Sequence, residues 1–241
     1  MFIITKKDII FYGIKTSLIL VTIFIPMVCT TSKMINVNAD TIASNTKIII
    51  DAGHGEPDGG AVSKDGIKES ELNLQIAKKL ASKLKESNFE VLMTREDENN
   101  IASESMQNKK IREIKTNDLN NRVKIANESG ASILVSIHMN KFEDSKYRGW
   151  QTFYSKNSEE GKKLAENIQS SISECIEYDN KRTALKIEGI KIIDKSTIPA
   201  VIVECGFLSN EEECRLLQEE MYQDKLAEGI KNGIIKYFSS F

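Results

Sequence analysis

The chain contains only two histidines, and each follows an apolar run that is typical of a buried strand. His54 comes shortly after the apolar run 47–50, and His138 ends the run 131–138. Strand ends at the rim of an open α/β sheet are where ligands collect. Two imidazoles that converge there could hold a metal ion, or one could act as a general base. Two histidines with satisfied hydrogen bonds and no chemical role remain an equally good interpretation of these residues alone.

Two acidic residues stand out because of their positions. Glu69 follows a glycine-rich loop at the predicted start of a helix, although Glu69 and Glu71 could both be first-turn acids favoured by the helix dipole. Glu204 follows the apolar run 198–203. An unpaired carboxylate at the end of a buried strand is costly to desolvate, so Glu204 is a strong candidate for a chemical role.

Together, His54, Glu69 and His138 offer the two nitrogens and one carboxylate of a catalytic zinc site, with a fourth position left for water. Zinc lowers the pKa of such a water to about 7. Glu204 is predicted as the general base that takes the proton from this water and returns it to a leaving amine. The spacing of the ligands matches no short zinc motif, so the prediction depends on each member lying at a strand end or a helix start.

The surrounding pattern alternates between strands and helices, which predicts an α/β fold with an open, mostly parallel sheet between two helical layers. Leu72, Ile76, Leu80 and Leu84 indicate an amphipathic helix that ends near Asn88. A polar stretch at 95–116 is predicted as a long loop, and Asn157 and Glu160 are predicted to cap a later helix. The expected strands are the run before His54 and the segments 89–94, 131–138, 150–154, 189–193 and 200–203, and further helices are expected before Gly130 and at the C-terminus.

Residues 1–39 are predicted as a signal peptide or an N-terminal membrane anchor. Lysines precede an uncharged, mostly apolar run at 16–32, and Ala39 offers a small-residue cleavage site. The run is shorter than the ~20 apolar residues of a comfortable spanning helix. Residues 40–46 are predicted as a linker and residues 47–241 as an exported catalytic domain. Residues 1–39 are expected to contact the membrane.

Charge and cysteine content narrow the class of protein. Without residues 1–39, which carry four lysines and one aspartate, the net charge changes from −2 to about −5. Such a surface gives no reason to propose nucleic acid as a partner. Cys175, Cys205 and Cys214 remain, and their odd number and irregular spacing do not suggest a disulfide framework. Buried free thiols are expected, although Cys205 and Cys214 could in principle pair.

Four motifs in order resemble the zinc-dependent N-acetylmuramoyl-L-alanine amidases of the Amidase_3 family. They are the glycine-rich segments 51–55 and 58–61, the pair Lys68-Glu69, the segment 136–140 and the segment 199–210. The resemblance covers about residues 47–238 and implies the phosphorylase/hydrolase-like three-layer sandwich. It implies His54, Glu69 and His138 as zinc ligands and Glu204 as the catalytic glutamate.

The same resemblance implies a substrate and partners. The substrate is peptidoglycan, cleaved at the amide bond between the lactyl group of N-acetylmuramic acid and the L-alanine of the stem peptide. The size and layout of the chain also resemble the sporulation amidases of this family, whose product leads to muramic-δ-lactam in the spore cortex. An accessory lipoprotein that activates the enzyme is a partner that this resemblance implies. Glu56 and Ser63 stand where the family usually has glycine, which predicts a differently shaped first loop.

Two other functions stay open at this point. A zinc carboxypeptidase or endopeptidase acting on the stem peptide would use a similar site, but such enzymes place His and Glu in one short motif that the chain lacks. A non-catalytic wall-binding domain would be expected to lack Glu204. Arg95 and Asn140 could orient substrate or be ordinary polar residues, and Trp150 could stack on sugar or pack in the core.

Overall fold

The computed structural model describes residues 46–106 and 108–240. The predicted signal peptide or anchor at 1–39, and all of the predicted linker except Thr46, lie outside the described residues. Within the described part of the chain, no helix is both long and apolar enough to cross a membrane.

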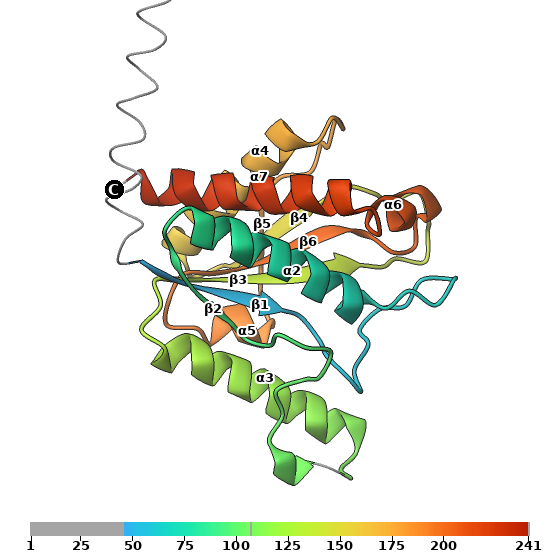
Figure 1. Ribbon diagram of the computed structural model, residues 1–241, viewed down its shortest axis with the longest axis vertical. Helices are drawn as coiled ribbons and strands as arrows, with labels where there is room; N and C mark the ends of the chain where they lie inside the picture. The colour runs from blue at the N-terminus through green and yellow to red at the C-terminus, as the bar shows by residue number, and fades with distance from the viewer. Residues whose placement is uncertain (1–45, 107, 241) are drawn as a thin grey trace, which may run out of the picture. The chain divides into compact units, whose positions relative to one another are not determined.

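A six-stranded sheet with the order β2-β1-β3-β6-β4-β5 lies at the centre of the fold (Figure 1). Its strands are β1 (Lys47–Ala52), β2 (Glu90–Met93), β3 (Ile133–Asn140), β4 (Gln151–Ser155), β5 (Leu185–Ile187) and β6 (Ala200–Phe207). Neighbouring strands are parallel except for β4 and β6, which are antiparallel. The expected mostly parallel sheet is confirmed. Strands β1, β3 and β6 are almost fully buried, which explains why they appear as continuous apolar runs.

Helices cover both faces of this sheet and complete three layers (Figure 1). One face is covered by α2 (Glu69–Glu86), α4 (Glu159–Cys175) and α7 (Glu220–Phe238), which share the larger hydrophobic core. The other face is covered by α3 (Ile111–Glu128) and the short α5 (Lys191–Asp194). A 3-10 turn (Glu104–Met106) and α6 (Glu211–Leu216) complete the described elements.

Helices α4 and α7 approach closely because α7 has glycines at the contact. A Cβ on Gly233 would lie only 2.5 Å from Ile168 Cα, and one on Gly229 would lie 2.6 Å from Ile172 Cα. Such distances are far below an ordinary carbon–carbon contact. The packing of these two helices therefore requires residues without side chains at both positions.

Three expectations about local structure are wrong. The segment 189–193 is not a strand, because helix α5 begins at Lys191 and the edge strand is β5. Short apolar runs do not distinguish a strand from a buried helical turn by periodicity. The predicted loop at 95–116 ends where α3 begins at Ile111, since the first turns of α3 are mostly exposed and lack an apolar stripe. Helix α4 is capped by Ser158, whose Oγ accepts the Gly161 N–H, and not by Asn157.

Candidate metal centre and active site

The two histidines and Glu69 meet at the carboxyl end of the central strands. His54 follows β1, His138 lies in β3, and Glu69 is the first residue of α2. One possible ligand atom from each residue lies within 4.8 Å of the others. The predicted convergence of these three side chains is confirmed. The parallel pairing of β1 with β3 brings the two histidines together, and the hydrogen bond from Glu69 N to Ala61 O holds the start of α2 beside them.

The distances within this cluster fit a small tetrahedral ion. Glu69 Oε1 lies 3.3 Å from His54 Nε2 and 2.9 Å from His138 Nδ1. Zinc ligands with bonds of about 2.0–2.1 Å at tetrahedral angles lie about 3.3 Å apart. The other oxygen, Glu69 Oε2, accepts the Ala61 N–H at 2.8 Å, which leaves Oε1 facing both imidazoles. Two nitrogens and one carboxylate are the donor set of a catalytic zinc site with one open position.

The charge state of Glu69 suits a ligand. Burial by itself would raise its pKa, but the hydrogen bonds and charges of His138 and His54 outweigh that effect. The pKa of Glu69 is therefore held well below its usual value. Its carboxylate is the ionised form that metal ions bind.

Asp58 orients the first histidine. Its Oδ2 lies 2.8 Å from His54 Nδ1, and its Oδ1 accepts hydrogen bonds from Lys115 Nζ at 2.7 Å and Gly60 N at 3.1 Å. Burial lowers the pKa of His54, but the hydrogen bonds of Asp58 and Glu69 raise it to about 9. Because Nδ1 is occupied by Asp58, His54 presents Nε2 to the cluster, which is the usual role of a carboxylate behind a ligating histidine. The role of Asp58 was not predicted from the sequence, although an acidic residue four positions after a candidate histidine ligand indicates a possible hydrogen-bond partner for that histidine.

Two buried arginines hold the loop that carries His54. The backbone of His54 has φ 61°, in the left-handed region that non-glycine residues rarely adopt. Arg122 Nη2 donates to the carbonyl oxygen of His54 at 2.6 Å. Arg122 is also paired with the buried carboxylate of Asp51. Arg95 donates through Nη2 to Gly53 O at 3.1 Å. Arg95 is thus a buried group that positions backbone and not a solvated surface charge.

His138 lies directly against Gly53. A Cβ on Gly53 would lie 2.2 Å from Cε1 and 2.3 Å from Nε2 of the His138 ring. The glycine before His54 is therefore required for the two imidazoles to approach each other, with ring centroids 5.1 Å apart.

Glu204 lies beside the three ligand groups, opposite His138 in the pairing of β3 with β6. Its Oε2 is buried and has no hydrogen-bond partner within the described residues. Burial, followed by the charge of Glu69, raises the pKa of Glu204 to about 7, against the opposing influence of His138 and His54. A carboxyl group that titrates near neutrality can both take up and release a proton. The strand continues to Phe207, so Glu204 lies at a register shift within β6 and not at its end.

A cavity of about 420 Å³ opens beside this cluster. It lies between α3 and α5, and its lining includes His54, His138, Glu204, Lys115 and Lys191. It is large enough for part of a peptide or a sugar next to the candidate ligands.

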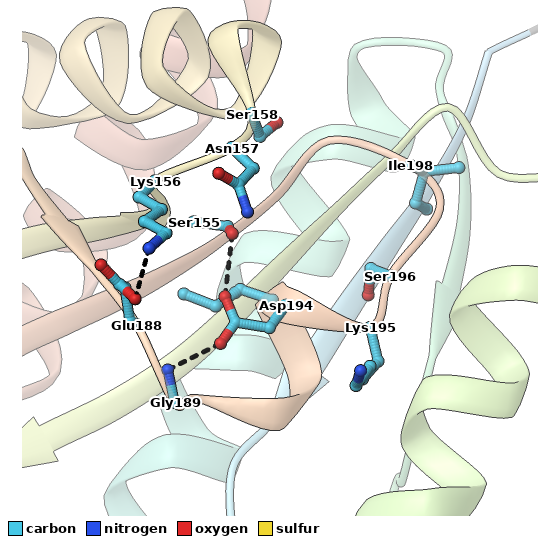
Figure 2. Close-up of a pocket in the computed structure, with 11 residues that line it drawn as sticks. Ser155, Lys156, Asn157, Ser158, Glu188, Gly189, Asp194, Lys195, Ser196 and Ile198 are labelled. Atoms are coloured by element: carbon cyan, nitrogen blue, oxygen red, sulfur yellow. Dashed lines mark hydrogen bonds and ion pairs between the residues drawn. The ribbon is translucent and has the colours of Figure 1, made fainter.

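A second cavity of about 330 Å³ lies towards the C-terminal end of α5 (Figure 2). Three of its charged groups, those of Lys156, Glu188 and Asp194, are already paired with protein. Lys156 Nζ lies 2.6 Å from Glu188 Oε2, and Asp194 accepts hydrogen bonds from Ser155 Oγ at 2.8 Å and Gly189 N at 2.7 Å. The cavity beside Glu204 is therefore the better candidate for an active site.

The other residues that the sequence analysis singled out make ordinary contacts within the fold. Trp150 is fully buried and its Nε1 donates to Gln169 O, which confirms core packing instead of sugar stacking. Cys175, Cys205 and Cys214 are free thiols, as expected, and Cys205 and Cys214 do not pair. Asn140 is half-buried and its Oδ1 accepts the Lys141 N–H, an ordinary polar contact.

Comparisons with known proteins agree with this site. The Amidase_3 family, described as N-acetylmuramoyl-L-alanine amidase, matches residues 48–236. The germination-specific N-acetylmuramoyl-L-alanine amidase of Bacillus subtilis is 38% identical over 192 residues, which cover 80% of this chain and 79% of that protein. The solved structure of the CwlD amidase from Clostridioides difficile, in complex with the GerS lipoprotein, is 42% identical with a TM-score of 0.79. It matches 82% of this chain and 100% of that chain.

A second solved structure, an N-acetylmuramoyl-L-alanine amidase from Clostridium difficile 630, is 34% identical with a TM-score of 0.71. It matches 82% of this chain and 99% of that chain. The family match spans most of the described residues and includes every residue of the candidate metal centre. The chain belongs to the Amidase_3 family and is an N-acetylmuramoyl-L-alanine amidase.

Proposed function

We propose that this amidase binds one zinc ion through His54, Glu69 and His138 and uses Glu204 as its general base and acid. The substrate is the amide bond between the lactyl group of N-acetylmuramic acid and the L-alanine of the stem peptide. The observation that carries the proposal is the meeting of three ligand groups beside the buried, unpartnered Oε2 of Glu204.

When bound, zinc supplies a Lewis acid that polarises a carbonyl oxygen and lowers the pKa of a water molecule. Glu204 takes a proton from the attacking water at Oε2 and passes it to the alanine nitrogen as the carbon–nitrogen bond breaks. The lactyl group leaves as a carboxylic acid, and the peptide leaves with a free amine. Asp58 keeps Nε2 of His54 directed at the cluster, so that the ligand does not need to reorient during the reaction.

The biological setting that we propose is the spore cortex. The relative from Bacillus subtilis is described as germination-specific, and the CwlD amidase of Clostridioides difficile was solved with a lipoprotein. A muramic acid without its stem peptide is the precursor expected for muramic-δ-lactam. We therefore propose a lipoprotein as a partner of this chain as well. Export or anchoring through residues 1–39, with residues 47–241 as the catalytic domain outside the cytoplasm, is consistent with that role.

Mass spectrometry of digested peptidoglycan tests the reaction. The purified protein is incubated with peptidoglycan in the presence of zinc or of a chelator. We expect free stem peptides that begin with L-alanine, and only when zinc is present. Stem peptides that are shortened while still attached to muramic acid would instead identify a peptidase.

Two variants separate the proposed roles. His138→Ala should lose both zinc and activity, because one of three protein ligands is removed. Glu204→Ala should lose activity but keep its zinc, measured by elemental analysis of the purified proteins. Equal loss of zinc from both variants would contradict the assignment of Glu204 as a proton-transfer group.

A further inference from the structure

The cavity between α3 and α5 is lined by three lysine or arginine residues, and two of them already pair with carboxylates of the protein. Lys115 Nζ lies 2.7 Å from Asp58 Oδ1. Arg122 is buried and paired with Asp51. Both side chains therefore already have carboxylate partners within the protein.

Lys191 is different. It is half-buried at the first turn of α5, and its Nζ contacts the neutral Oδ1 of Asn120 on α3. Across residues 46–106 and 108–240, Lys191 forms no ion pair with a carboxylate, whereas many lysines of the chain do. A lysine ammonium without a carboxylate partner can still attract an anion that enters the cavity. Among the described residues, the positive charge of Lys191 therefore has no carboxylate partner, and it lies at the cavity that also contains Glu204.

Part of the cavity wall is apolar. Leu119 of α3, together with Ile190, Ile192 and Ile202, lines the same cavity. Apolar walls exclude water and strengthen the attraction between a lysine and a carboxylate. A ligand with small apolar groups and a carboxylate fits this lining, and an acidic peptide has that chemistry.

We propose that Lys191 binds a carboxylate of the stem peptide and makes the enzyme select an acidic peptide on the leaving side of the scissile bond. The inference rests on the proposed function, because it requires the peptide to lie in this cavity when its first amide reaches Glu204. In a stem peptide whose second residue is a glutamate joined to the next residue through its side chain, the carboxylate closest to the scissile bond is the free α-carboxylate of that glutamate. Lys191 contacts the substrate but transfers no proton, so it affects selectivity and not bond cleavage.

The test uses two soluble muramyl peptides that differ only at this group, one with the free α-carboxylate and one with the carboxamide. The wild-type protein is compared with Lys191→Met in the presence of zinc. We expect Lys191→Met to raise KM for the acidic substrate about tenfold, as for the loss of a hydrogen-bonded charge pair, with kcat nearly unchanged. Kinetics with the carboxamide should not change. Lys191→Arg should restore most of the preference.

Lys195→Met is the matched control. Lys195 lies just past the end of the same short helix, is exposed, and faces the second cavity (Figure 2). Its removal changes the net charge by the same amount as removal of Lys191. We expect Lys195→Met to keep the wild-type preference for the acidic substrate.

Three outcomes would overturn the inference. The first is that the wild-type enzyme does not distinguish the two substrates. The second is that Lys191→Met raises KM equally for both substrates. The third is that Lys195→Met loses the preference for the acidic substrate as Lys191→Met does. Calorimetry with a zinc-loaded Glu204→Ala protein measures the same preference for binding without cleavage. If neither substrate is cleaved by the wild-type enzyme but the acid-specific binding depends on Lys191, the proposed function fails and the carboxylate site stands.

Discussion

The contact between Gly53 and His138 predicts that one added methyl group at Gly53 strongly weakens zinc binding. In Gly53→Ala the new Cβ would lie 2.2 Å from Cε1, 2.3 Å from Nε2 and 2.7 Å from Nδ1 of His138. Gly53 is not in the left-handed region of backbone conformation, so alanine at this position adds steric conflict and no backbone strain.

The expected loss of zinc affinity follows from comparing the distance that His138 must move with the change in bond length that a metal site tolerates. Ordinary carbon contacts are 3.5–4.0 Å, so the imidazole of His138 has to move by more than about 1 Å. Metal–ligand distances tolerate changes of only about 0.2 Å. His138 would therefore no longer reach the ion, and we expect zinc affinity to fall by at least about 100-fold, which is beyond the usual effect of losing an outer hydrogen bond. The cost in folding free energy should be about 1–3 kcal/mol, as for other overpacked sites.

Gly59→Ala is the control, because it adds the same methyl group in the same loop. Its Cβ would meet only the flexible side chain of Lys68, at 3.3 Å from Cδ. Zinc affinity is measured by competition with a chromophoric chelator, and the fold is checked by thermal unfolding without zinc. Gly59→Ala should bind zinc normally. Wild-type affinity in Gly53→Ala would refute the reasoning, because His138 would then not be a ligand held in this position.

Two further predictions concern stability. Burial would raise the pKa of Asp51, but Arg122 and the hydroxyl of Ser136 outweigh this effect and hold the pKa below the usual 3.8. The ionised Asp51 therefore stabilises the folded state fully above about pH 4, and this stabilisation is lost as the pH falls through the folded-state pKa. Asp51→Asn should therefore cost about 3–5 kcal/mol at pH 7 and less at pH 2.5 in urea unfolding, and an equal cost at both pH values would contradict this origin. Gly233→Ala places a Cβ 2.5 Å from Ile168 Cα and should lower stability by about 1–3 kcal/mol while leaving zinc affinity unchanged; loss of zinc binding in this variant would be unexpected.

The centre of the sheet and the edge strand β2 could be predicted from the sequence, but the strand at the other edge, β5, could not. Strands β1, β3 and β6 are buried on both faces, so their residues had to be apolar and the runs are unmistakable. At the edge, β5 has only three residues and is mostly exposed, so it leaves no such pattern. The nearby apolar residues Ile192 and Ile193 belong to a helical turn instead.

The candidate ligands were also predictable, because each lies next to an element with a clear pattern. His54, Glu69 and His138 are chemically distinctive residues at a strand end, a helix start and a strand. Their meeting follows from parallel pairing, which brings the carboxyl ends of adjacent strands to one edge.

Residue chemistry and local periodicity were enough to predict the candidate ligands, the central strands and the family. Three other features depend on the folded chain. Asp58 occupies Nδ1 of His54, Arg122 donates to the carbonyl oxygen of His54, and Lys191 has no carboxylate partner within residues 46–106 and 108–240. These features join residues that are close in space through loop conformation and helix packing. No local pattern records them, because a side chain's partners are set by the positions of all elements that surround it.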